Sequence, residues 1–141
     1  DIARELKLPI AIHSRDAAQD TIQIMRASRA EEIGGVIHCY SYSKESARDF
    51  LNMGFYFGIG GVVTFKNAKK LKEAVAYIPL SNIVLETDAP YLTPEPFRGK
   101  RNDSSKLTYV AQAIADIKHI PVDEVYAETW KNAHQMYKIQ K

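Results

Sequence analysis

The sequence predicts an α/β fold with the architecture of a TIM-like (β/α)8 barrel, and two observations support this. Short apolar segments rich in β-branched residues alternate with amphipathic segments, which implies parallel strands joined by helical crossovers. Polar residues also fall at the ends of the predicted strands. His13 and His38 are about one barrel unit apart in the sequence, and His38 and Asp88 are about two units apart. An open doubly wound sheet would show the same alternation, but it would not explain two histidines and an aspartate at strand ends.

Four segments have the composition of buried strands. They are residues 10–13, 36–39, 55–59 and 83–88. Because side chains alternate along a strand, Glu86 and Asp88 share one face of the last segment. In a parallel barrel the C-terminal strand ends meet at one site, so we expect His13, His38 and Asp88 to converge there.

Alternation also makes predictions for smaller residues in these strands. Cys39 is expected to point away from the site into the helix layer, as a buried and inert thiol. Gly58 and Gly60 fall on one face of the third strand, which indicates a crowded interior or close approach by a ligand.

Amphipathic stretches between and after the strands are typical of helices. They cover residues 16–29, 43–54, 67–77 and 104–118, followed by a helix that starts near Pro121 and a last short one from Thr129. Asp16 and Ser43 are expected as N-caps, and Gly54 as the residue that ends its helix. Residues 1–7 resemble the middle of an amphipathic helix, without an initiating Met.

Composition describes an ordinary globular protein, with 141 residues, 45% hydrophobic and 26% charged. We expect one domain, residues 1–141. The formal net charge is only +2, so any attraction to phosphate must be local. No apolar run approaches the ~20 residues of a membrane span, and no signal peptide opens the sequence. Cys39 is the single cysteine, which excludes an intrachain disulfide and fits an expected cytoplasmic location.

The three strand-end residues have the chemistry of a metal centre. Imidazole and carboxylate together suit zinc, manganese or iron, and such a cation can activate water. A lone histidine in an apolar strand is more often structural, but the coincidence of His13, His38 and Asp88 at matched positions favours metal ligands. Glu86 lies one layer below Asp88, so it is expected to be buried and to need a cationic or hydrogen-bonding partner.

A basic segment follows the last strand. Arg98, Lys100 and Arg101 could hold backbone phosphates near the metal. The alternative is that Arg98 pairs with a local carboxylate and holds the long loop in place. Tyr40, Tyr42 and Tyr91 lie just beyond strand ends and could stack on bases, with Tyr91 the best placed.

Several strings resemble the TatD family of metal-dependent deoxyribonucleases. They are IHSR (12–15), GVIHC (35–39), GGVVTFKNA (60–68), LETDAPYL (85–92) and PFRGKRN (96–102). The resemblance implies an amidohydrolase-type barrel that holds one or two divalent cations (Mg, Mn or Zn) and acts on DNA. His13, His38 and Asp88 match metal ligands of that family, and Asp88 is also the expected water-orienting base.

The family's His-x-His pair on the first strand and its bridging glutamate have no counterpart here. The sequence therefore looks like the C-terminal half of the barrel, about strands five to eight plus the closing helices. The N-terminal half is expected to be a required partner, and this chain alone is expected to be inactive.

The predicted function is metal-dependent hydrolysis of phosphodiester bonds in DNA, with Asp88 and Glu86 as catalytic residues. An alternative on the same barrel is acyl or amide hydrolysis, such as deacylation of an aminoacyl ester. A third interpretation is a non-catalytic phosphate-binding module, because a chain that lacks some of the family's metal ligands need not be an enzyme.

Overall fold

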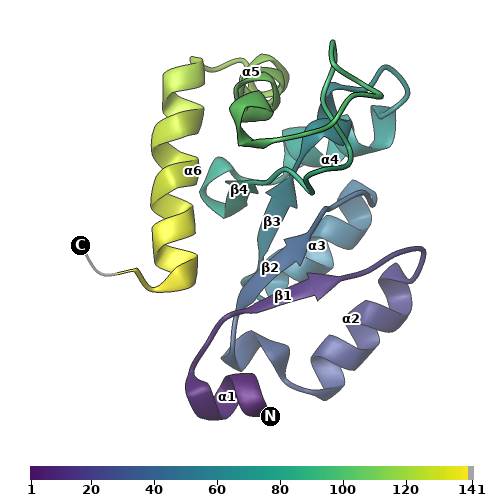
Figure 1. Ribbon diagram of the computed structural model, residues 1–141. Helices are drawn as coiled ribbons and strands as arrows, with labels where there is room; N and C mark the ends of the chain where they lie inside the picture. Colours follow the sequence, from purple (N-terminus) through teal and green to yellow (C-terminus); the bar gives the residue numbers. More distant parts are fainter. Residues whose placement is uncertain (140–141) are drawn as a thin grey trace.

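A computed structural model describes residues 1–139, and it contains one sheet of parallel strands in the order β1-β2-β3-β4 (Figure 1). The strands are β1 (Ile10–His13), β2 (Gly35–His38), β3 (Tyr56–Ile59) and β4 (Ile83–Leu85). The predicted α/β class and the parallel pairing are confirmed. Because β1 pairs with β2 in the register that sets His13 beside His38, both strands end at the same level.

The helices that the structure describes are α1 (Ile2–Leu6), α2 (Ala18–Ala27), α3 (Lys44–Asn52), α4 (Lys69–Tyr77), α5 (Leu107–Lys118) and α6 (Val122–Tyr137). Helices α2, α3 and α4 are the crossovers between successive strands and lie on one face of the sheet (Figure 1). Against them the sheet buries Ile37, Phe57 and Ile59 almost completely. Each such side chain contributes roughly 1.5–3 kcal/mol to folding.

Helix α6 covers the other face at the N-terminal ends of the strands (Figure 1). Its residues Ala133 and Met136 pack against Val36 and Val84. Asn132 is 1% exposed, and its Nδ2 donates hydrogen bonds to the carbonyls of Leu80 and Ile83, both at 2.8 Å. These bonds fix the start of β4 to α6, at the end of the strand remote from Asp88.

Two predicted helix boundaries were wrong. Asp16 does not cap α2, because it adopts a left-handed backbone with φ of 53° and the N-cap position falls on Ala17. Thr129 does not start a separate helix, because α6 is continuous through it. The Thr129 hydroxyl donates to Val125 O at 2.7 Å, so the polar side chain is satisfied inside the helix.

Other predicted caps are present. Ser43 Oγ accepts from Ser46 N at the start of α3, and Gly54 follows that helix with φ of 73°. The segment predicted to begin at Ser104 or Ser105 opens with a 3-10 turn, Ser104–Lys106, capped by Asp103.

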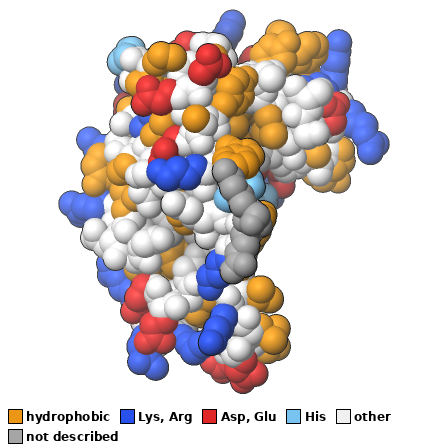
Figure 2. All heavy atoms as spheres, turned by 90° about the vertical axis from the view of Figure 1, so that its left-hand side faces the viewer, with side chains coloured by type: hydrophobic (Ala, Val, Ile, Leu, Met, Phe, Trp, Pro, Cys, Tyr) orange, Lys and Arg blue, Asp and Glu red, His pale blue; other side chains and the backbone are white. Residues whose placement is uncertain are grey.

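Charge is mixed over the surface that carries α6, where acidic and basic side chains are interspersed (Figure 2). This agrees with the small net charge of the whole sequence. Within residues 1–139, no helix combines the length and the apolar character needed to cross a membrane.

Candidate metal centre

The C-terminal ends of β1, β2 and β4 bring the three predicted ligands together. The rings of His13 and His38 have centroids 6.1 Å apart, and His38 Nε2 lies 3.3 Å from Asp88 Oδ1. All three residues line one pocket of about 470 Å³. The expected convergence at one edge of the sheet is therefore present in the structure.

Glu86 lies on the other side of the His38 ring. Its Oε2 is 3.0 Å from His38 Nδ1, and its side chain is only 16% exposed. An ionised carboxylate can only accept hydrogen bonds, so if a cation takes the lone pair of Nε2, Nδ1 carries the proton that Glu86 accepts. Glu86 holds the His38 ring with Nε2 towards Asp88, the arrangement that a metal-ligating histidine requires.

The backbone of β3 makes room for this carboxylate. A Cβ atom built on Gly58 would overlap Glu86 Oε2. The glycine that the sequence pattern singled out thus permits close approach by Glu86 rather than by an external ligand. Glu86 N also donates to Ile59 O at 3.1 Å, which continues the pairing with β3 one residue beyond β4.

The predicted orientation of Cys39 was wrong. The residue adopts φ of 52°, so the alternation of β2 stops after His38 and the thiol lines the same pocket as His38 and Asp88. Ligand atoms of His38, Cys39 and Glu86 all lie within 4.8 Å of one another. Burial, followed by the negative charge of Glu86, raises the pKa of the Cys39 thiol to about 12.

The donor set fits a divalent cation. Glu86 Oε1 is buried without a hydrogen-bond partner, and among the described residues no Lys or Arg forms an ion pair with Glu86 or Asp88. Two carboxylates that flank one imidazole are costly to keep partly buried unless a positive charge compensates them. Imidazole nitrogens and carboxylate oxygens are suitable ligands for zinc or manganese.

A second, basic pocket adjoins the first. It has a volume of about 600 Å³ and is lined by all four predicted substrate-binding residues, Tyr91, Arg98, Lys100 and Arg101. Tyr91 and Leu92 line both pockets. The Arg98 guanidinium lies 4.1 Å from the centroid of the Phe65 ring, and no ion pair joins it to a carboxylate within residues 1–139. The alternative role for Arg98, pairing with a carboxylate, is therefore absent from the described part of the chain.

The other tyrosines have structural roles. Tyr40 is 3% exposed and packs edge-on against Phe57, with ring centroids 5.0 Å apart. Tyr42 OH lies 2.7 Å from Ser14 Oγ, which holds the segment after β1. The buried Tyr40 ring is not free to stack on a base, and Tyr42 is partly buried, whereas Tyr91 is 70% exposed.

Arg15 is a residue that the sequence analysis missed. It is exposed and lines the first pocket together with His13. The signal was available, because a cation two residues after a predicted metal ligand at a strand end necessarily lies close to the site.

The sequence matches a protein family described as "TatD related DNase" over residues 1–138. It is 48% identical over 138 residues to the uncharacterized metal-dependent hydrolase YabD of Bacillus subtilis, covering 98% of this chain and 54% of that protein. Identity to the uncharacterized metal-dependent hydrolase YcfH of Escherichia coli K12 is 41% over 138 residues, with 98% and 52% covered.

Solved structures agree. YJJV, a TatD homolog from Escherichia coli K12, superposes with a TM-score of 0.91 at 27% identity, covering 99% of this chain and 53% of that one. A hydrolase TatD family protein from Entamoeba histolytica shows the same fold, with a TM-score of 0.84, 23% identity, and 94% and 51% covered. The chain spans about half the length of these relatives. The match over residues 1–138 and the identity to YabD and YcfH together show that the chain belongs to the TatD-related DNase family.

Proposed function

We propose that the chain is part of a metal-dependent hydrolase that cleaves phosphodiester bonds in DNA. The observation that carries the proposal is the junction of two pockets. The pocket with His13, His38 and Asp88 shares Tyr91 and Leu92 with the basic pocket, so a bound strand can reach both at once. Three neighbouring cations favour a substrate that carries phosphates over an uncharged acyl or amide substrate.

His13, His38 and Asp88 would hold one or two divalent cations, Mg²⁺, Mn²⁺ or Zn²⁺. Such a cation, when bound, supplies Lewis acidity and lowers the pKa of a coordinated water. Asp88, whose side chain is 34% exposed and faces the pocket, orients the attacking water and accepts its proton. Glu86 acts through His38 as a positioning residue, because its contact is with Nδ1 and its side chain is largely buried.

The basic pocket holds the substrate. Arg98, Lys100 and Arg101 supply the local positive charge that the whole sequence lacks, and they contact phosphates on either side of the scissile bond. Tyr91 offers its exposed ring to a base.

We further propose that the sheet is the C-terminal half of a (β/α)8 barrel. Among the described residues, β1 and β4 each pair with one strand only, and Ala11 and His13 are exposed on the open face. The relatives are about twice as long as this chain. An N-terminal half would pair with both edges and supply the missing ligands, so the chain alone would be inactive.

Asp88→Asn should abolish most of the activity of the full-length protein, since an amide neither accepts the proton nor compensates the cation. We expect kcat on DNA in Mn²⁺ to fall by a factor on the order of 10²–10⁴, as is typical for loss of a general base. Running the wild type on DNA, an aminoacyl ester and an amide decides the substrate class. Ester or amide hydrolysis without DNA cleavage would contradict the nuclease proposal.

Glu86→Gln should reduce metal affinity and activity by about 10- to 100-fold, the usual effect of removing a carboxylate that orients a metal-ligating histidine. Metal affinity is measured by titration calorimetry and activity on DNA. Glu73→Gln, on the exposed side of α4, is the matched control. Equal behaviour of the two variants would show that the Glu86–His38 contact is dispensable.

Lys100→Gln combined with Arg101→Gln should raise KM for DNA about tenfold or more at low salt and flatten its salt dependence, with little change in kcat. The control is Lys69→Gln combined with Lys70→Gln, which removes the same charge from the exposed surface of α4. If both double variants change KM alike, the basic pocket is not the phosphate site.

A further inference from the structure

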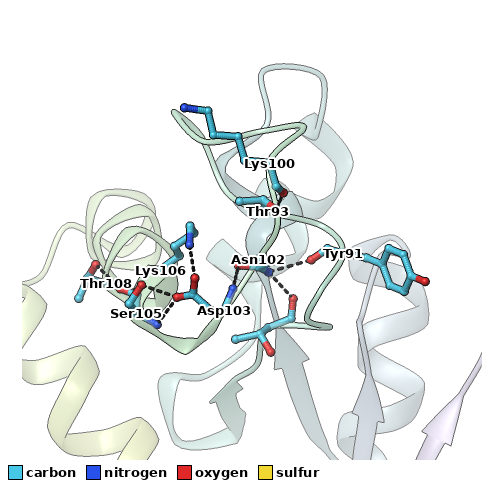
Figure 3. A network of polar contacts seen from close by, with 9 residues as sticks. Tyr91, Thr93, Lys100, Asn102, Asp103, Ser105, Lys106 and Thr108 are labelled. Carbon is cyan, nitrogen blue, oxygen red and sulfur yellow. Dashed lines mark hydrogen bonds and ion pairs between the residues drawn. The ribbon is translucent and has the colours of Figure 1, made fainter.

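We propose that Asn102 is a positioning residue that holds Asp88 at the metal centre. This inference rests on the proposed function, because it concerns the same site. Asn102 lies in the loop between β4 and α5, with its side chain directed at the backbone of Tyr91 (Figure 3). It is 3% exposed and lines neither pocket itself, so any effect on chemistry must act through the residues that it holds in place.

The Asn102 side chain is fully used in main-chain hydrogen bonds (Figure 3). Nδ2 donates to Thr87 O at 2.9 Å and to Tyr91 O at 2.8 Å, and Oδ1 accepts from Asp103 N at 2.9 Å. Its backbone N donates to Pro90 O at 3.0 Å. Asn102 thus ties both ends of segment 87–91 to Asp103, the residue that caps the 3-10 turn Ser104–Lys106.

Asp88 needs that support. Its φ is 56°, in the left-handed region, which is uncommon for a non-glycine residue although aspartate adopts it more readily than most. Tyr91 N donates to Asp88 O at 2.9 Å and closes the turn. The two carbonyls that Asn102 binds belong to Thr87, directly before Asp88, and to Tyr91, which closes the turn, so Asn102 fixes the strained residue from both sides.

The position of Asp88 is what the site depends on. Its Oδ1 lies 3.3 Å from His38 Nε2, and relaxation of the turn would carry the carboxylate away from the ring. A displacement of about 1 Å in a catalytic group can cost about 100-fold in rate.

Asn132 provides a matched control. It is also buried, and its Nδ2 also donates to two carbonyls, but at the opposite end of β4 and away from both pockets. Replacement by alanine removes two Nδ2 hydrogen bonds to carbonyls at either position, and at Asn102 it also removes the bond that Oδ1 accepts from Asp103 N. Asn102→Ala should therefore lower the unfolding midpoint at least as much as Asn132→Ala.

The test compares Asn102→Ala, Asn132→Ala and the milder Asn102→Ser in the full-length protein. Thermal unfolding, Mn²⁺ affinity and the kinetic constants on DNA are measured for each. We expect Asn102→Ala to lose at least tenfold in Mn²⁺ affinity and in kcat, with a smaller change in KM. Asn102→Ser should be intermediate, since its hydroxyl can donate one bond, and Asn132→Ala should stay within twofold of the wild type in both quantities.

Equal kcat and Mn²⁺ affinity in the two alanine variants would overturn the positioning role, as would wild-type values in Asn102→Ser if Asn102→Ala does not fold. A wild type that neither binds Mn²⁺ nor cleaves DNA would instead overturn the proposed function, and this inference with it. The two failures are therefore distinguishable.

Discussion

The His38 imidazole between two carboxylates is the interaction on which the rest of the site depends. Glu86 holds Nδ1 at 3.0 Å, which leaves Nε2 facing Asp88 at 3.3 Å. The parallel register brings His13 beside this ring, and the absence of a side chain at Gly58 admits Glu86. The β1–β2 register, Gly58 and the partly buried contact between Glu86 and His38 therefore together determine where His38 Nε2 points.

Electrostatics explains why such an arrangement suits a cation. The Asp88 carboxylate and the Cys39 thiol line one pocket, and a ligand atom of Glu86 lies within 4.8 Å of the thiol. Glu86 Oε1 is buried and has no hydrogen-bond partner. The high pKa of Cys39 reflects the same burial and the same negative charge. A divalent ion at the His38 and Asp88 side of the pocket would offset this negative charge, whereas Arg98, Lys100 and Arg101 lie in the adjoining pocket, where they suit phosphate.

Much of the sheet and of the metal centre could be predicted from the sequence, because the alternation of apolar and amphipathic segments indicates where each parallel strand ends. The apolar runs and the spacing of His13, His38 and Asp88 were sufficient to place the predicted ligands at one edge. Cys39 could not be placed, because alternation fails where the backbone turns left-handed after β2. The role of Asn102 was also out of reach, since its hydrogen bonds to Thr87 and Tyr91 depend on the path of a long loop.

The most direct test is anomalous diffraction from crystals of the full-length protein grown with Zn²⁺. The account predicts a peak about 2.0–2.2 Å from both His38 Nε2 and an Asp88 oxygen, with His38 Nδ1 still bonded to Glu86. A fully occupied zinc site elsewhere, with His38 Nε2 and Asp88 free of metal, would contradict it.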